Sequence, residues 1–156
     1  MIRLVLVRHA KSEWGDPGLD DHDRPLNGRG TGDAPRMAER LAATGFRPDA
    51  IRSSTALRAR TTAAAFGEVL GVAVDLVPEL YGASARTLLA EASALRVPSV
   101  LIVAHDPGMS VLAEQLSDGG IAHMPTCAVA SFAWDEDEWD VATAVPPASW
   151  SFDSPR

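Results

Sequence analysis

The sequence contains a single cysteine, Cys127, among its 156 residues. One cysteine cannot form a disulfide within the chain, and a zinc site built on cysteine ligands is nearly excluded. Long apolar runs are also missing: no stretch approaches membrane-spanning length, and the first one, Leu4 to Val7, is too short for a signal peptide. We therefore expect a cytoplasmic protein without a membrane partner.

Basic residues are scarce relative to acidic ones. The chain has 14 Lys and Arg against 21 Asp and Glu, which gives a formal net charge of -7. Nucleic acid is therefore not expected as the main partner, unless basic residues cluster locally. Hydrophobic residues make up 46% of the sequence, which suits one compact domain with a sizeable core and argues against disorder.

Strand-like and helix-like segments alternate along most of the chain. The most distinct strand is the continuous apolar run SVLIVA at residues 99–104, typical of a sheet covered on both faces. Strands are expected at residues 2–7, 49–53, 72–77 and 99–104, and helices at 28–44, 56–70, 84–95 and 108–116. This alternation predicts an α/β protein, a three-layer α/β/α sandwich with a mostly parallel central sheet.

The C-terminal part has a different pattern. Residues 128–134 and 139–144 flank the acidic sequence DEDE, which predicts an antiparallel hairpin at one edge of the sheet. The last segment, PPASWSFDSPR, is rich in proline and serine. We therefore expect a single domain over residues 1–145 and a loosely held tail over residues 146–156.

Three of the expected strands end close to polar residues. The first ends at Arg8 and His9, the second leads into a helix that carries Arg58, and the last ends at His105. The carboxyl ends of parallel strands share one rim of a sheet, where ligands bind in open α/β folds. We therefore expect two arginines and two histidines around one crevice.

This set of side chains suits phosphoryl transfer. Two guanidiniums can grip several phosphoryl oxygens, and a helix that begins just after His105 would add free N–H groups. One neutral imidazole can attack phosphorus, while a second, protonated imidazole donates to the oxygens. The positive side chains replace the charge that Mg²⁺ supplies elsewhere, so no metal or other cofactor is expected.

Each residue taken alone also has a simpler interpretation. His9 can be a hydrogen-bonded core histidine, and His105 can cap the following helix. Arg58 can be a solvated helix residue, with Arg60 as the inward one instead. Only their joint occurrence at three strand ends favours the functional interpretation.

The other two histidines, His22 and His123, are expected on the surface. A metal site formed by His22 and the aspartates of the loop at residues 14–25 is an alternative. Its spacing matches no standard ligand pattern, so a solvated loop is favoured.

The chain resembles the histidine phosphatase superfamily in its first strand and loop, LVLVRHAKS, where family members have Arg-His-Gly or Arg-His-Ala. It is similar to the family's Ser-x-x-x-Arg-x-x-x-Thr segment in SSTALRARTTAAA, with Ser54, Arg58 and Thr62 at the matching places. The stretch LIVAHDPGM resembles the family segment that holds the second histidine. The stretch DHDRPLNGRG resembles the Arg-Pro-Leu segment of the small bacterial phosphohistidine phosphatases of the SixA type. The resemblance covers about residues 1–145 and implies a phosphoglycerate mutase-like fold.

The resemblance implies a role for each matching residue. His9 is the nucleophile that becomes phosphorylated, and Arg8 and Arg58 bind the phosphoryl oxygens. His105 binds and stabilises the same group from the other side, and Ser54 shapes the turn.

The chain also departs from the family pattern. Ala10 replaces the commoner glycine, and Gly15 stands where the mutases often have an asparagine that contacts phosphate. Glu79 lies where many members place the acid that protonates the leaving group, although it can equally be a surface carboxylate. Lys11 can add charge at the mouth of the site, but a solvated loop lysine is favoured. The other candidate acids are Asp16, Asp20, Asp21, Asp23 and Asp106.

The uncertain acid bears on the substrate. An alkoxide leaving group needs a well-placed acid, whereas the imidazole of phosphohistidine is a better leaving group that can carry its own proton. The sequence therefore favours a phosphatase that acts on phosphohistidine of a protein partner. Alternatives are a phosphomonoesterase for a small phosphorylated molecule and a non-catalytic phosphoryl-binding module on the same core.

Overall fold

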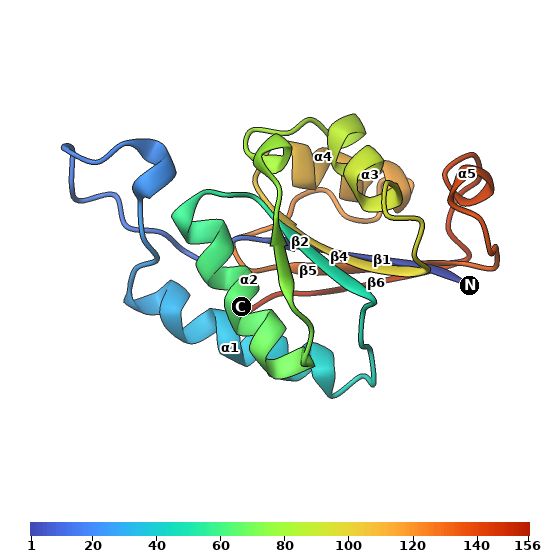
Figure 1. The fold of residues 1–156 in the computed structure, drawn as a ribbon, viewed down its shortest axis with the longest axis horizontal. Coiled ribbons are helices and arrows are strands. Elements are labelled where there is room, and N and C mark those ends of the chain that lie inside the picture. Colours follow the sequence, from blue (N-terminus) through green and yellow to red (C-terminus); the bar gives the residue numbers. More distant parts are fainter.

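A six-stranded mixed sheet forms the middle layer of the molecule, and helices cover both of its faces (Figure 1). The computed structural model describes all 156 residues. The strand order is β3-β2-β4-β1-β5-β6. The strands are β1 (Ile2–Arg8), β2 (Ala50–Ser53), β3 (Val74–Leu76), β4 (Ser99–Ala104), β5 (Val129–Trp134) and β6 (Ser149–Asp153). The expected three-layer α/β architecture is confirmed.

The helices divide between the two faces of the sheet. The α-helices are α1 (Gly28–Ala42), α2 (Leu57–Leu70), α3 (Ala85–Ser93), α4 (Gly108–Leu116) and α5 (Trp139–Ala142), and the 3-10 helices are η1 (Asp21–Asp23) and η2 (Pro78–Leu80). Helices α1 and α2 cover one face, and α3, α4 and α5 lie on the other (Figure 1). None of these helices is long and apolar enough to cross a membrane.

Strand β1 owes its continuous apolar sequence to its place in the middle of the sheet. It pairs in parallel with β4 and antiparallel with β5. Leu4 and Leu6 pack into the core under α3 and α4, while Val5 and Val7 pack into the core under α1 and α2. Apolar residues are therefore needed at both alternating positions, because both faces of the strand are buried.

The parallel strands end at the same rim of the sheet, as expected. Arg8 at the end of β1 lies opposite Ala104 at the end of β4, and Ser53 at the end of β2 lies opposite Val103. The polar residues that follow these strands are thereby brought side by side.

The prediction of a second hairpin strand at residues 139–144 is wrong. Within residues 139–144, Trp139 to Ala142 form the short helix α5 instead of a strand. Trp139 is buried against Trp134, with ring centroids 6.5 Å apart, and its indole N–H donates to the Val97 carbonyl at 2.7 Å. One helical turn buries Trp139 and Ala142 on the same side, and burial of the indole outweighs the strand-like alternation.

The C-terminal segment is also different from the expectation, because it is not a loosely held tail. Strand β6 pairs antiparallel with β5 and forms the edge of the sheet, with Trp150 opposite Phe132. Arg156 then donates to the buried carboxylate of Asp33 on α1 at 2.7 Å. An ion pair between Arg40 and Asp153 forms a second link to α1. The antiparallel edge of the sheet is present, but residues 149–153 supply its outer strand.

A chain that ends after Ala148 tests the importance of β6. We expect the free energy of unfolding to fall by about 3 kcal/mol, because the contacts of Trp150 and Phe152, which are 43% and 39% exposed, are lost together with the β5 ladder. The control is R156A, which removes only the ion pair to Asp33 and should cost below about 1 kcal/mol. Urea unfolding of both proteins measures the difference, and equal stability of the truncated and full chains would contradict a structural role for β6.

Candidate active site

Two backbone hydrogen bonds to β4 align the residues that follow the strands. The N–H of His9 donates to the carbonyl of Ala104 at 3.1 Å, and the N–H of Ser54 donates to the carbonyl of Val103 at 3.0 Å. His105 follows β4 directly, and its ring centroid lies 5.1 Å from that of His9. The two histidines expected from the sequence are therefore neighbours.

The ring of His9 is held by its own loop. Its Nδ1 lies 2.8 Å from the carbonyl oxygen of Ala10, which can only accept, so Nδ1 carries the proton and donates. The Ala10 N–H in turn donates to Thr62 Oγ1 at 3.0 Å, and the Thr62 hydroxyl donates to the Arg58 carbonyl. This chain fixes the ring and leaves Nε2 of the neutral imidazole with a free electron pair.

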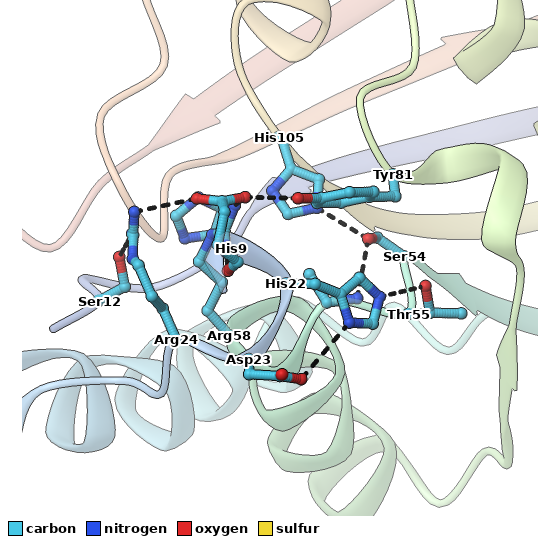
Figure 2. Close-up of polar contacts among 12 residues, drawn as sticks. His9, Ser12, His22, Asp23, Arg24, Ser54, Thr55, Arg58, Tyr81 and His105 are labelled. Atoms are coloured by element: carbon cyan, nitrogen blue, oxygen red, sulfur yellow. Dashed lines mark hydrogen bonds and ion pairs between the residues drawn. The ribbon is translucent and has the colours of Figure 1, made fainter. Parts of the chain in front are cut away.

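The ring of His105 is held by Ser54. Its Nε2 lies 2.8 Å from Ser54 Oγ, which also accepts the N–H of Ala56 at 3.2 Å. Ser54 thus shapes the turn, as expected, and in addition orients the second histidine (Figure 2). The Nδ1 of His105 is buried and has no protein partner, so it is an orphan polar atom in the site.

Both imidazoles are neutral at pH 7. Burial lowers the pKa of His9 from 6.5 to about 4, and the positive charges of Arg58 and Arg8 add to this effect. Burial, the neighbouring His9 and Arg58 lower the pKa of His105 to about 3. The sequence suggested a protonated second imidazole, but His105 is neutral and offers a single N–H.

The two histidines line a cavity of about 230 Å³. The residues around it are Arg8, His9, Lys11, Ser12, Trp14, Asp21, Arg24, Arg58, His105, Asp106 and Thr126. Four of these side chains are basic and two are acidic, so the cavity is positive although the chain carries a net charge of -7. Such a local excess of positive charge attracts anions to one place.

The two expected arginines reach this cavity from different elements. Arg8 donates from Nη1 to the Met124 carbonyl at 2.9 Å, and its buried Nε has no partner. Arg58, at the start of α2, is buried, whereas Arg60 is exposed and does not line the cavity. Of the two arginines weighed for α2, Arg58 is the inward one.

A third arginine, Arg24, was missed as a site residue although it lies within the quoted DHDRPLNGRG stretch. It is buried, it donates to the hydroxyl of Ser12, and its guanidinium lies 3.6 Å from the ring centre of Trp14. A guanidinium over an indole face is a favourable cation–π contact. Only tertiary structure brings Arg24 to the end of β1.

The candidate acids separate into two groups. Asp21 and Asp106 line the cavity, while Asp16, Asp20 and Asp23 do not. Glu79 is exposed on η2 and is also absent from the cavity wall.

Asp106 and Asp21 are both ion-paired. Asp106 lies 3.5 Å from Arg8 and accepts a hydrogen bond from the N–H of Ser110 at 2.9 Å. This N–H, near the start of α4, is one of the donors that were expected to face the ligand, and it is bound to Asp106 instead. The pKa of Asp21 is lowered to about 2, chiefly because Tyr81 donates to it and also because Arg58 does. Asp21 is therefore an ionised carboxylate and not a proton donor at pH 7.

Of the remaining histidines and Lys11, only His123 is fully on the surface. His22 on η1 lies 2.8 Å from Thr55 Oγ1 and is half-buried, so it helps to dock the loop and is not a free surface residue (Figure 2). His123 is exposed, as expected. Lys11, which was expected to be solvated, is half-buried and lines the cavity.

The loop that carries Asp21 and Arg24 is closed at its base. Glu13 N–H donates to the Pro25 carbonyl at 2.8 Å, and Asn27 N–H donates to the Lys11 carbonyl at 3.0 Å. Gly30 on α1 packs so closely here that an added Cβ would lie 2.0 Å from the Lys11 carbonyl oxygen. The start of α1 and the loop after β1 therefore form one tightly packed base.

The arrangement defines an anion site in which two neutral histidines and three arginines line one cavity. No group of three or more His, Cys, Asp or Glu residues is placed to hold a metal ion. Whether the reaction is independent of metal stays a prediction.

Comparison with known proteins identifies the family. The family model of the histidine phosphatase superfamily (branch 1) matches residues 4–86. An uncharacterized chloroplast protein of Arabidopsis thaliana, At3g52155, is 30% identical over 165 residues, covering 97% of this chain and 75% of that protein. The chain belongs to the histidine phosphatase superfamily, and it is a phosphatase.

Solved structures support the expected branch. A protein assigned as the phosphohistidine phosphatase SixA of Agrobacterium tumefaciens is 30% identical, with a TM-score of 0.81 and 99% of both chains covered. A protein assigned as SixA of Nakamurella multipartitia is 28% identical, with a TM-score of 0.83 and coverage of 99% of this chain and 96% of that chain. The SixA type and the phosphoglycerate mutase-like fold expected from the sequence are confirmed.

The low pKa of His9 predicts a pH dependence of stability. The unfolded residue titrates near 6.5 and the folded one near 4, so the unfolded state binds more protons between these values. We expect the free energy of unfolding to fall as the pH is lowered from 7 to 4. Urea unfolding across this range measures the effect, and H9N should show a shallower fall. An equal slope in H9N and the wild type would contradict a neutral His9.

Proposed function

We propose that this phosphatase acts through a phosphohistidine intermediate on His9 and removes phosphate from phosphohistidine of a protein. The observation that carries the proposal is the hydrogen bond from His9 Nδ1 to the Ala10 carbonyl, 2.8 Å long. It leaves the electron pair of Nε2 free for attack on phosphorus. The lowered pKa keeps this electron pair available at neutral pH.

The side chains around His9 have complementary roles in this proposal. Arg8 and Arg58 bind the phosphoryl oxygens with N–H donors, and the unpartnered Nε of Arg8 is one such donor. His105 donates from its unpartnered Nδ1 while the Ser54 hydroxyl donates to Nε2. These donors stabilise the charge that develops on the oxygens during transfer.

The first step moves the phosphoryl group to His9. Nε2 of His9 forms a bond to phosphorus, and the bond between phosphorus and the substrate nitrogen breaks, with its electron pair going to that nitrogen. When the substrate ring is protonated on its other nitrogen, it leaves as a neutral imidazole. No protein acid is required for this step.

The second step returns His9 to its starting state. Water attacks phosphorus, and the bond to Nε2 breaks with its electron pair returning to Nε2. Inorganic phosphate is released and carries both protons of the water. The proton on Nδ1 stays in its hydrogen bond to Ala10 during both steps, so the phosphorylated ring is protonated and leaves as neutral imidazole. One hydrogen bond thereby serves attack and release.

The substrate class rests on the missing acid. Glu79 is exposed and outside the cavity wall, Asp21 is ionised, and Asp106 is ion-paired with Arg8. An alkyl phosphate needs a donor for its alkoxide, whereas phosphohistidine does not. The similarity to proteins assigned as SixA phosphohistidine phosphatases supports the same class. The partner is then a phosphorylated protein, and the cytoplasmic location stays a prediction.

Single-turnover labelling with a phosphorylated histidine-containing transfer protein tests the nucleophile. The wild type should form an acid-labile phosphoenzyme, and H9A should form none, because the ring that accepts the phosphoryl group is absent. R60A is the control for a substitution away from the site, since Arg60 is exposed on α2 and lies outside the cavity. Labelling of H9A at the wild-type level would refute the assignment.

The variant E79Q tests the leaving-group argument. Because Glu79 lies outside the cavity wall, we expect E79Q to keep turnover of phosphohistidine within about twofold of the wild type, as an exposed carboxylate contributes little. An alkyl phosphate such as p-nitrobenzyl phosphate is measured in parallel. Selective loss of alkyl phosphate turnover would assign Glu79 as an acid and favour the alternative, a small-molecule phosphomonoesterase.

A further inference from the structure

The carboxylate of Asp21 lines the cavity and accepts hydrogen bonds from three side chains, two of which belong to distant segments of the chain. Arg58 Nη2 donates to Asp21 Oδ2 at 2.9 Å, and the Tyr81 hydroxyl donates to the same oxygen at 2.6 Å. Arg24 Nη1 donates to Oδ1 at 3.2 Å. An additional bond runs from Arg58 Nη1 to the backbone carbonyl of Asp21 at 2.6 Å.

These donors have the chemistry of an oxyanion site. Two guanidiniums and one hydroxyl converge on a carboxylate, as they would on the oxygens of a phosphoryl group. Arg58 is moreover one of the two arginines to which phosphoryl binding was assigned above. The anion that these donors bind in the structure therefore belongs to the protein itself.

The position of Tyr81 strengthens the link to the reacting groups. Its ring lies edge-on to His105, with centroids 5.5 Å apart, and edge-on to His22, with centroids 5.0 Å apart (Figure 2). The hydroxyl bound to Asp21 is thus carried by a ring packed against the second histidine of the site. Tyr81 lies only two residues after Glu79, which was a candidate acid in the sequence. Nothing in the sequence itself indicates that Tyr81 contacts the site.

We propose that the Asp21 carboxylate competes with the phosphoryl group for the same donors. Substrate binding then displaces the carboxylate from Arg58, Arg24 and Tyr81. The three donors then pass to the phosphoryl oxygens. Arg24 and Tyr81 become phosphoryl-binding residues in addition to Arg8 and Arg58. This inference rests on the proposed phosphoryl site, but it does not require His9 to be the nucleophile.

The exchange favours a strongly charged ligand. A doubly charged phosphoryl group gains more from two guanidiniums than a single carboxylate does, so it can replace Asp21. A singly charged anion has no such advantage and must compete on equal terms. Asp21 therefore lowers the affinity for all anions and selects for doubly charged phosphoryl groups.

The segment that carries Asp21 keeps other contacts when the carboxylate leaves. His22 on η1 remains 2.8 Å from Thr55 Oγ1, and the base of the loop is closed by the bond between Glu13 and Pro25. Asp21 is itself exposed, so its side chain can turn towards solvent without disturbing the core. Rotation of one side chain is sufficient for the exchange.

Binding of inorganic phosphate at pH 8, measured by titration calorimetry, tests the proposal. D21N should bind phosphate about tenfold more tightly than the wild type, because the competing charge is removed from the donors. D20N is the matched control. It removes the same charge one residue away, and Asp20 makes no side-chain cap contact and does not line the cavity. D20N should stay within about twofold of the wild type.

The opposite outcomes overturn the proposal. If Asp21 only orients Arg58 for catalysis, D21N will bind phosphate more weakly than the wild type. If the effect is a general one of loop charge, D21N and D20N will tighten binding equally. D21A provides a second variant that also removes the amide, and it should match D21N.

The proposed function is judged by a different readout in the same proteins. Phosphate binding requires no turnover, whereas phosphoenzyme formation reports on His9. Tighter phosphate binding by D21N together with no labelling of the wild type would overturn the nucleophile and leave the competitor in place. Labelling of the wild type together with weaker phosphate binding by D21N would overturn the role of Asp21 as a competitor and leave His9 as the nucleophile.

Discussion

The hydrogen bonds from His9 and Ser54 to the end of β4 are the interaction on which the site depends. Each continues a parallel ladder by one residue beyond the end of a strand, so the sheet sets the distance between the histidine rings. The rings need no flexible loop to meet, and their geometry is as rigid as the core beneath them. Preorganisation of this kind spares the protein the entropy of ordering catalytic groups when the substrate binds.

The close spacing has an electrostatic consequence. Arginines that are needed to hold an anion also repel protons from the neighbouring imidazoles, and burial acts in the same direction. The positive charge that binds substrate thus also keeps the nucleophile unprotonated. An anion bound in the cavity reverses part of this effect, so the protonation of His105 becomes linked to the presence of the phosphoryl group. The same positive field explains why a carboxylate of the chain itself, that of Asp21, lies against Arg58 and Arg24.

The sequence predicted the parallel core and the gathering of four site residues, because both depend on short local patterns. A buried run followed by Arg8 and His9 identifies a strand and its end without any tertiary information. Trp139 could not be predicted in this way, because its helical turn depends on a contact with Trp134 and a bond to Val97. Arg24 and Tyr81 lie outside the strand ends, and only the folded chain brings them to Asp21.

The closed base of the loop between β1 and α1 has a consequence for how such a protein can diversify. Hydrogen bonds join Glu13 to Pro25 and Lys11 to Asn27, so the chain leaves the sheet and returns to α1 through one fixed neck. The tight packing of Gly30 against Lys11 keeps that neck in place. The loop beyond the neck can therefore change in length or sequence without altering the register of β1 or the start of α1. Evolution can therefore vary this loop, and with it Asp21 and Arg24, while the residues that other segments bring to the cavity stay in place.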